Sequence, residues 1–213
     1  MLVGQGYSPF NRGYSGCVVS YDEATALIVV DVQNDFAHPN GSLYVSGGEK
    51  VIPFINDQID EARRGGALVV LTQDWHPAAT PHFQDYGGIW PVHCVGGTWG
   101  AELHDDLQAG PTDPRVRKGA NGEDGYSGFT VADPKTGASS PTGLKDILNE
   151  AGIKRLVIVG LATDYCVKAT VLDARRAGFG TTALADGIRP VELHPGDAEA
   201  AIEEMKKAGA QVI

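Results

Sequence analysis

Short apolar runs alternate along the chain with segments in which apolar residues recur at helical spacing. The runs expected to be strands buried on both faces of a sheet are residues 26–30, 67–71, 156–159 and 181–185. Residues 115–118 are a weaker strand candidate, and a last short run covers residues 210–213. Parallel strands need long crossover connections, which helices usually supply. The alternation therefore predicts an α/β fold with a mostly parallel central sheet and helices on both of its faces.

Helical periodicity follows three of the four apolar runs. The recurring apolar positions are Val51, Ile55, Ile59 and Ala62, then Val167, Val171 and Ala174, and finally Ala198, Ile202 and Met205. Each of these segments is followed by glycine, which often ends a helix. A fourth helix is predicted to have Ser140 as its N-cap and Pro141 at its first position, and to end at Gly152.

Glycine and proline concentrate in two long stretches, residues 77–100 and 111–143. These stretches show neither the apolar runs of strands nor the apolar spacing of helices. Loops of this length in a compact domain usually form sites, and open parallel sheets bind ligands beyond the carboxyl ends of their strands. Residues 1–23 are also aperiodic and are rich in Gly, Tyr and Ser. We therefore expect residues 1–23 to form a loosely ordered extension and residues 24–213 to form a single domain.

Composition and charge narrow the classes of function. The chain has 27 acidic and 17 basic residues, a formal charge of −10, so its surface repels phosphate backbones and nucleic acid is not an expected partner. No apolar run is long enough to span a bilayer, and no signal peptide pattern appears. Three cysteines, an odd number, do not make a disulfide framework. These features predict a cytoplasmic protein without a membrane partner.

The predicted strands bring chemically capable residues to one edge of the sheet. Asp31 ends the first strand and Lys118 ends the weaker candidate, while Cys166 follows the third apolar run. If Thr163 is the N-cap of a helix, Cys166 lies in its first turn, where the helix dipole favours the thiolate and free N–H groups could hold an oxyanion. The alternative for this cysteine is a small buried hydrophobe. Asp31 and Lys118 are the candidate proton carrier and thiolate partner, although each alone would be an ordinary turn or surface residue.

A second set of candidate residues lies in and after the second predicted strand: Asp74, His76, His82 and His93. Asp74 and His76 are two residues apart in an extended segment, so their side chains can point the same way. Histidine and carboxylate are ordinary ligands for zinc and iron. A single loop histidine is more often a solvated side chain. Four such residues within 20 positions favour a metal site.

Five stretches of the chain carry a resemblance to one family. They are VDVQNDF at residues 30–36, TQDWHP at 72–77, WPVHCV at 90–95, KGA at 118–120 with YSGF at 126–129, and GLATDYCV at 160–167. In this order they resemble the nicotinamidases, also called pyrazinamidases, of the isochorismatase-like cysteine hydrolases. The resemblance runs from about residue 26 to the C-terminus. It implies a three-layer α-β-α sandwich of the isochorismatase-like, Rossmann-like type, with residues 24–213 as the cysteine-hydrolase domain.

The resemblance also implies roles for particular residues. The implied catalytic triad is Asp31, Lys118 and Cys166, and the implied metal ligands are Asp74, His76 and His93, with His82 added in members of the mycobacterial type. The residues implied for substrate binding are Phe36 and Trp90 on the two sides of a ring, Tyr126 at a ring nitrogen, and Ala162, whose amide joins that of Cys166 in an oxyanion hole. A cis peptide bond before Ala162 is part of the same pattern.

The activity implied is metal-dependent hydrolysis of nicotinamide to nicotinate and ammonia, and of pyrazinamide to pyrazinoate, through a cysteine thioester, in NAD salvage. One divalent transition metal ion is expected, zinc or iron before manganese. Two alternatives stay open: an amidase of the same superfamily that acts on a carbamoyl compound or a ureide, and a catalytically silent binding protein. A nucleotide-binding enzyme is disfavoured, because no Gly-x-Gly-x-x-Gly follows a strand. The oligomeric state also stays open, with a homo-oligomer among the alternatives.

Overall fold

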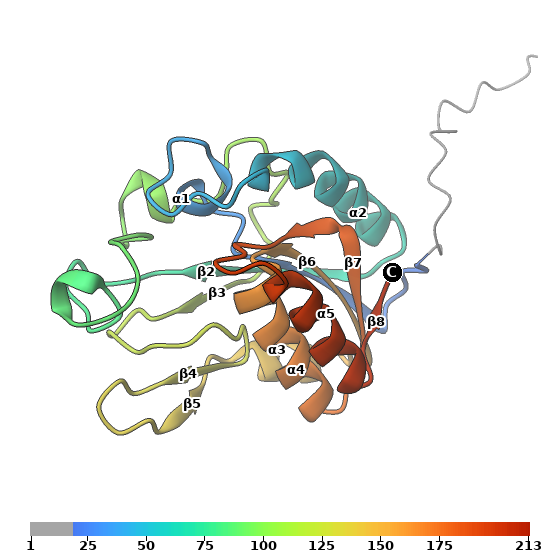
Figure 1. Ribbon diagram of the computed structural model, residues 1–213. Helices are drawn as coiled ribbons and strands as arrows, with labels where there is room; N and C mark the ends of the chain where they lie inside the picture. The colour runs from blue at the N-terminus through green and yellow to red at the C-terminus, as the bar shows by residue number, and fades with distance from the viewer. Residues whose placement is uncertain (1–18) are drawn as a thin grey trace, which may run out of the picture.

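A parallel sheet forms the centre of the computed structural model, which describes residues 19–213 (Figure 1). Its six strands lie in the order β3-β2-β1-β6-β7-β8, and every neighbouring pair is parallel. The strands are β1 (Thr25–Val30), β2 (Leu68–Asp74), β3 (Arg115–Lys118), β6 (Arg155–Leu161), β7 (Gly180–Arg189) and β8 (Gln211–Val212). The predicted parallel sheet is confirmed, and the weaker strand candidate and the last apolar run are its two edges.

Helices cover both faces of the sheet. One face carries α2 (Ile52–Arg64), the short α1 (Asn34–Ala37) and the 3₁₀ turns η1 (Gly48–Val51) and η3 (Trp99–Ala101), and the other carries α3 (Leu144–Glu150), α4 (Lys168–Arg176) and α5 (Asp197–Lys207) (Figure 1). The loops add a third 3₁₀ turn, η2 (Gln84–Tyr86), and a two-stranded hairpin of β4 (Thr130–Ala132) and β5 (Ser139–Pro141). The predicted three-layer α-β-α arrangement is confirmed.

The core is divided in two by the sheet. β1 is buried along its whole length, and successive side chains of a strand point to opposite faces. Leu27 and Val29 therefore pack with Ile55 and Ile59 of α2, whereas Ile28 belongs to the cluster under α3, α4 and α5. Each buried leucine or isoleucine contributes about 1.5–3 kcal/mol to folding. Packing on both faces fixes the position of β1, and β1 leads directly to one of the candidate site residues.

The start of α3 differs from the sequence prediction. Ser140 and Pro141 are not the cap and first turn of the helix, because residues 139–141 form β5 and pair antiparallel with β4. Gly143, in the left-handed conformation, precedes the helix, and the Thr142 hydroxyl accepts the Leu144 N–H at 3.2 Å. Pairing with a strand that lies near in space thus outweighs the local helix-start pattern.

Residues 19–23, the described part of the predicted extension, contact the domain. Val19 and Tyr21 pack against the core cluster under α2, and the Tyr21 hydroxyl donates to Gln58 Oε1 at 2.9 Å. Asp22 forms an ion pair with Arg155 at the start of β6. The rest of the predicted extension, residues 1–18, lies outside the described residues.

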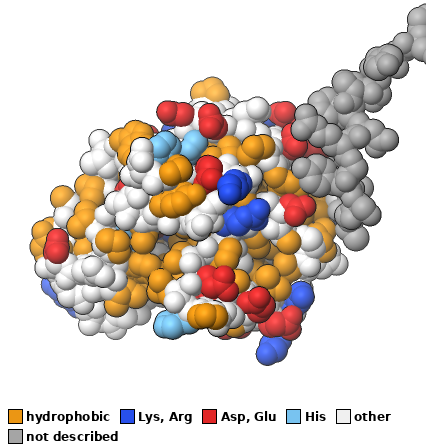
Figure 2. Space-filling model, turned by 45° about the horizontal axis from the view of Figure 1, so that its top comes forward, with side chains coloured by type: hydrophobic (Ala, Val, Ile, Leu, Met, Phe, Trp, Pro, Cys, Tyr) orange, Lys and Arg blue, Asp and Glu red, His pale blue; other side chains and the backbone are white. Residues whose placement is uncertain are grey.

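The described surface agrees with the acidic composition. On the face drawn in Figure 2, acidic and basic side chains are interspersed among apolar ones, and no broad basic patch is visible there. Within residues 19–213, no helix is both long enough and apolar enough to cross a membrane.

Candidate active site

Three strands bring Asp31, Lys118 and Cys166 together at one edge of the sheet. Asp31 follows β1, Lys118 ends β3, and Cys166 lies in the π-helical turn η4 (Thr163–Val167) after β6. The chain runs outward from β1 to β3 on one side and from β6 to β8 on the other, so the strand order reverses between β1 and β6. Ligand sites of open α/β sheets lie beyond the strand ends at such a reversal.

Lys118 is the centre of this group. Its Nζ lies 2.7 Å from Asp31 Oδ2 and 3.5 Å from Cys166 Sγ, and it also donates to Asp74 Oδ1. The Thr72 hydroxyl donates to the other oxygen of Asp31 at 2.6 Å. Lys118 and Asp31 are at most 1 % exposed. Because buried charges are costly unless they are paired, this network holds its members in one arrangement.

The pKa values of the three groups follow from this burial and pairing. Burial lowers the pKa of Lys118, but Asp31 and Asp74 outweigh it and raise that pKa well above its ordinary value. Burial raises the pKa of Asp31 against the opposing charge of Lys118. Burial also raises the pKa of the Cys166 thiol well above its ordinary value, again opposed by Lys118. A helix start was expected to favour a thiolate; in the folded protein burial raises the pKa of the thiol, and Lys118 is the group that opposes this shift.

The turn that carries Cys166 differs in detail from the sequence prediction. Thr163 is not the N-cap: Ala162 precedes the helical turn, and Cys166 is the fourth residue of η4 and not the third of an α-helix. The Val167 N–H donates to the Ala162 carbonyl, five residues back, so the turn is wider than an α-helical one. The Leu161–Ala162 peptide bond is cis, as the resemblance implies.

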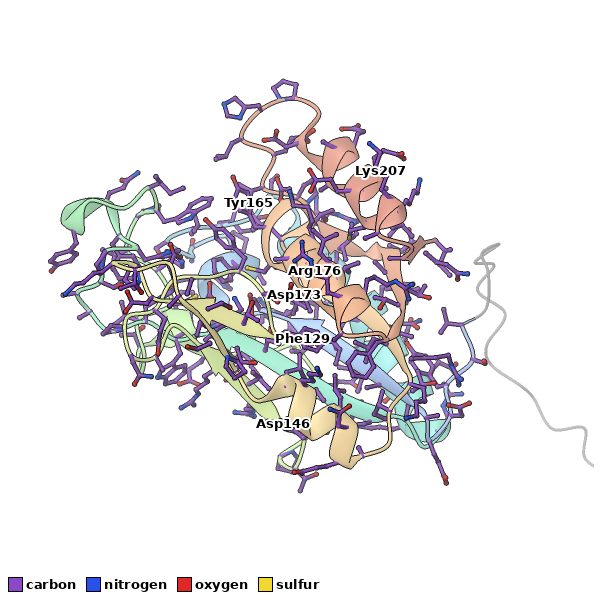
Figure 3. All side chains as sticks on the ribbon, turned by 90° about the horizontal axis from the view of Figure 1, so that it is seen from below. Phe129, Asp146, Tyr165, Asp173, Arg176 and Lys207 are labelled. Atoms are coloured by element: carbon purple, nitrogen blue, oxygen red, sulfur yellow. The ribbon has the colours of Figure 1, made fainter. Side chains whose placement is uncertain are left out.

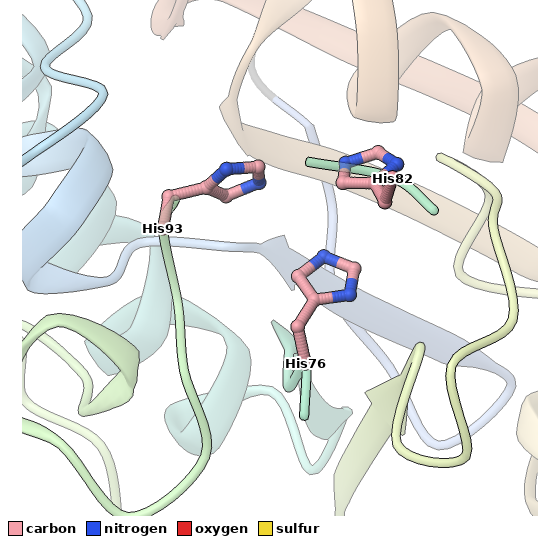
Figure 4. Close-up of side chains that lie close together, drawn as sticks. All are labelled: His76, His82 and His93. Atoms are coloured by element: carbon pink, nitrogen blue, oxygen red, sulfur yellow. The ribbon is translucent and has the colours of Figure 1, made fainter. Parts of the chain in front are cut away.

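Three histidines lie against one another beside this group (Figure 4). One ring nitrogen from each of His76, His82 and His93 lies within 4.8 Å of the others. The His93 Nδ1 lies 2.7 Å from the Pro91 carbonyl, which leaves Nε2 free. The Nε2 atoms of His76 and His93 are each 3.9 Å from the Oδ2 of Asp74. The four residues predicted as metal ligands are therefore neighbours in space.

The chemistry of this donor set fits a divalent metal ion. Burial lowers the pKa of His76 to about 4 and also lowers that of His93, so both rings are neutral. Burial alone would raise the pKa of Asp74, but Lys118 and the two histidines outweigh it and lower the pKa to about 2. Neither ring nitrogen of His76 has a hydrogen-bond partner among residues 19–213, although the ring is buried. Neutral imidazoles, an ionised carboxylate and an unpartnered buried nitrogen are the properties that a metal site requires.

A pocket lies over Cys166 and beside the histidines. Its lining residues are Phe36, Leu43, Val45, Asp74, His82, Trp90, His93, Tyr126, Ala162, Tyr165, Cys166 and Val191. All four residues predicted to bind substrate are among them. The Trp90 Nε1–H donates to the Tyr126 hydroxyl at 3.0 Å, and the Tyr165 ring is 5.0 Å from that of Trp90 and 5.3 Å from that of Tyr126. The pocket wall is therefore mainly aromatic.

Four residues that shape the pocket were not predicted from the sequence. Tyr165 lies in the turn before α4 (Figure 3), and its position next to Cys166 was a signal that could have found it. Val191 gives no local signal, because it comes from the loop after β7. The Asp164 carboxylate brings it to the pocket by accepting the N–H groups of Val191 and Glu192 at 2.9 and 2.8 Å. Leu43, like Val45, comes from an irregular loop without a motif.

Comparison with known proteins agrees with this arrangement. The family model for the isochorismatase domain matches residues 25–213. The nicotinamidase of Escherichia coli K12 is 38% identical over 201 residues, which cover 87% of this chain and 92% of the relative. The pyrazinamidase of Pyrococcus horikoshii in complex with zinc superposes with a TM-score of 0.77 at 41% identity, covering 89% of this chain and 98% of its own. PnC1 from L. infantum in complex with nicotinate superposes with a TM-score of 0.83 at 36% identity, covering 92% of this chain and 96% of its own. The chain belongs to the isochorismatase family.

Proposed function

We propose that this protein is an amidase that hydrolyses nicotinamide to nicotinate and ammonia, and pyrazinamide to pyrazinoate, in cytoplasmic NAD salvage. The observation that carries the proposal is the position of Lys118 Nζ between Asp31 and Cys166, the thiol of which lines an aromatic pocket. The likeness to the nicotinamidase of E. coli supports it. We assign the activity to residues 24–213, with residues 1–23 as an extension of this domain.

Cys166 is the proposed nucleophile. Its thiol transfers its proton to the Asp31 carboxylate as the sulfur attacks the amide carbon, and Lys118 stabilises the negative charge that develops on sulfur. The amides of Ala162 and Cys166 bind the oxyanion. When the tetrahedral intermediate collapses, the C–N bond breaks and Asp31 returns the proton to the leaving ammonia. The raised pKa of Asp31, which follows from its burial, suits a group that carries a proton in this way.

The second half of the reaction uses the same residues. Ammonia leaves a thioester between the nicotinoyl group and Cys166, and Asp31 is again a carboxylate. Asp31 takes a proton from water, the water oxygen attacks the thioester carbon, and the C–S bond breaks with the proton returned to sulfur. The products are nicotinic acid, which ionises to nicotinate, and the restored thiol.

Substrate binding is assigned to the aromatic wall and the histidine group. Phe36 and Trp90 enclose a planar ring, and such ring contacts contribute about 0.5–1.5 kcal/mol beyond the burial of area. The Tyr126 hydroxyl accepts from Trp90 and so keeps its own proton for a ring nitrogen. Asp74, His76, His82 and His93 would hold one divalent ion, zinc or iron before manganese. When bound, the ion supplies a Lewis-acidic partner for the pyridine nitrogen. The zinc complex of the P. horikoshii relative supports zinc.

An ammonia-release assay with a panel of amides tests the proposal. The wild-type protein should hydrolyse nicotinamide and pyrazinamide, and Cys166→Ala should be folded and inactive. Benzamide has the same shape without a ring nitrogen, so it should be a much poorer substrate. Preference for an aliphatic carbamoyl compound would instead support the alternative amidase, and full activity of Cys166→Ala would refute the proposed chemistry.

A further inference from the structure

The loop between Lys118 and β4 places a carboxylate against the third histidine of the group. Asp124 Oδ1 lies 2.7 Å from His82 Nδ1. The side chain of His82 is 5 % exposed, whereas that of Asp124 is 46 % exposed. A carboxylate only accepts hydrogen bonds, so Nδ1 of His82 is the donor in this contact and Nε2 is the nitrogen left for a metal ion. From this contact we infer that Asp124 is a positioning residue that orients the His82 ring for metal binding, an inference that rests on the proposed metal site.

The geometry of His82 supports this role. Its ring stacks on that of His76 with centroids 4.7 Å apart and an angle of 21° between the planes, and its centroid is 5.3 Å from that of His93. His82 and His93 thus each have Nδ1 fixed by an oxygen, from Asp124 and from the Pro91 carbonyl. Oxygen partners of this kind fix the tautomer and the ring orientation of metal-bound histidines, and a charged carboxylate also raises the basicity of the ring.

The Asp124 carboxylate is itself held in place by the backbone. Asp124 and Ala132 exchange two backbone hydrogen bonds of 2.8 and 2.6 Å, which attach the loop to the end of β4. The Gly125 N–H donates to Asp124 Oδ1 at 2.8 Å. Gly125 has a φ of 136°, and a side chain there would lie 3.1 Å from the Cα of Val131, so this close attachment requires glycine. Asp124 therefore meets His82 at a fixed position, unlike the partners of a mobile surface ion pair.

The same loop offers a matched control. Glu123 is the neighbouring acidic residue. Among residues 19–213 its carboxylate bonds only within the loop, to the backbone N–H and the side-chain amide of Asn121, both at 2.8 Å. Glu123→Ala removes one negative charge and loosens the loop without touching a histidine. Asp124→Ala removes one negative charge together with the contact to His82. A comparison of the two variants separates ring orientation from loop order and from net charge.

The experiment measures the zinc dissociation constant of the metal-free full-length chain by competition with a chromogenic chelator. Asp124→Ala should weaken zinc binding about 10–100-fold, the usual effect of removing such a partner. Asp124→Asn keeps a hydrogen-bond acceptor without the charge, so its zinc dissociation constant should lie between those of the wild type and Asp124→Ala. Glu123→Ala should stay within about twofold of wild type. In a His82→Ala background, Asp124→Ala should have no further effect, because Asp124 acts through that ring.

The outcomes distinguish this inference from the proposed function. Zinc binding by wild type and by Asp124→Ala with equal affinity overturns the inference and leaves the metal site standing. An equal loss in Glu123→Ala, or an undiminished effect of Asp124→Ala without His82, also overturns it. If the wild-type chain binds no zinc, the metal site of the proposed function fails and the inference fails with it. Thermal unfolding of the metal-free variants shows whether each is folded, and Asp124→Asn supplies the comparison if Asp124→Ala is not.

Discussion

At the scale of single residues, Lys118 has the most demanding environment in the site. It is 1 % exposed and contacts two carboxylates and a thiol. A buried lysine is stable in its charged form only with such partners, and the carboxylates depend equally on the lysine. Removal of Lys118 should therefore damage the fold as well as the reaction.

We expect Lys118→Met to lower the free energy of unfolding at pH 7 by about 3–5 kcal/mol, because Asp31 and Asp74 are left buried without a cation. Urea denaturation measures this loss. Lys168→Met is the control, since Lys168 forms a partly exposed ion pair with Glu204 and should lose less than about 1 kcal/mol. If the two variants had equal free energies of unfolding, Lys118 would not be needed to stabilise the buried carboxylates of Asp31 and Asp74.

The sequence was informative about some site residues and silent about others for a physical reason. Asp31, Asp74 and Lys118 could be predicted because each ends or directly follows a strand, and parallel strands end at one edge of the sheet. Asp124 acts, in our inference, through His82, 42 positions away. Val191 reaches the pocket through Asp164, 27 positions away. Contacts between residues of distant loops produce neither a hydrophobic period nor a local motif in the sequence. They can therefore be identified only in the folded structure.

At the scale of elements, the strand β6 and the turn that follows it depend on a glycine. Gly160 has a φ of 115°, and a Cβ there would lie 2.1 Å from the Val30 carbonyl oxygen. The register between β6 and β7 also shifts between Ile158 and Gly160. The chain thus approaches β1 closely just before the residues that lead to Cys166.

Gly160→Ala should destabilise the protein by more than about 3 kcal/mol, the sum of a strained backbone and a collision with β1. Gly178→Ala is a matched control, because Gly178 has a φ of 93° but, apart from its chain neighbours, no heavy atom of the described residues lies within 4 Å of the added Cβ. That variant has the backbone strain alone and should lose about 1–2 kcal/mol. Thermal and urea unfolding of both variants give the difference, and losses of equal size would show that the close approach to Val30 is unimportant.

The loop after β7 is a second element on which the pocket depends. Asp164 accepts the N–H groups of Val191 and Glu192, and Val191 lines the pocket. Asp164→Ala should release this loop and raise KM for nicotinamide about tenfold, since charge-assisted hydrogen bonds contribute about 1.5–3 kcal/mol. The kcat should change less, because the loop contacts neither Asp31 nor Lys118 among the described hydrogen bonds and ion pairs.

Steady-state kinetics on nicotinamide distinguish this role from a general loss of structure. Asp173 lies on the same helical segment, in α4 (Figure 3), and its carboxylate bonds Thr130 and Arg176. Asp173→Ala removes an acidic residue from this segment without touching the loop, so KM should stay near the wild-type value. A fall in kcat with unchanged KM in Asp164→Ala would show that the residue acts on the reacting groups and not on the pocket wall.

Local sequence patterns predicted the boundaries of two helical elements incorrectly. Ser140 followed by Pro141 is a sound local helix start, but the same residues pair with β4. Thr163 has a side chain suited to an N-cap, but the turn after β6 is π-helical, starts at Thr163 and has Ala162 as its N-cap. At Ser140 and Pro141 the pairing with β4 outweighs a local capping preference of about 1 kcal/mol.

At the scale of the whole molecule, the sheet order decides which residues meet. The alternation of strand and helix predicted a parallel sheet but not its order. β1 lies between β2 and β6, so the residues that follow β1 can contact groups from both neighbours. Apolar runs that are buried on both faces resemble one another, which is why their periodicity does not specify the neighbours of each strand.

Metal removal is the prediction that involves the whole molecule. Ligand that binds only the folded state stabilises it by about 2.7 kcal/mol at a concentration 100-fold above Kd. The His76 ring nitrogens have no hydrogen-bond partner among residues 19–213, and a bound ion would give one of them a partner. For a domain of this size, such a free energy corresponds to a fall in Tm of about 5–10 °C when a chelator removes the metal.

Differential scanning calorimetry of the zinc-loaded chain, with and without chelator, measures this shift. His76→Ala provides the control, because it removes one proposed ligand and leaves Asp31, Lys118 and Cys166 in place. The Tm of this variant should respond little to chelator, although the loss of a buried ring that stacks on His82 lowers its Tm without metal below that of the metal-free wild type. A chelator-induced fall of the same size in His76→Ala and in wild type would place the stabilising ion elsewhere, and no fall in wild type would show that the histidine group holds no metal that matters for stability.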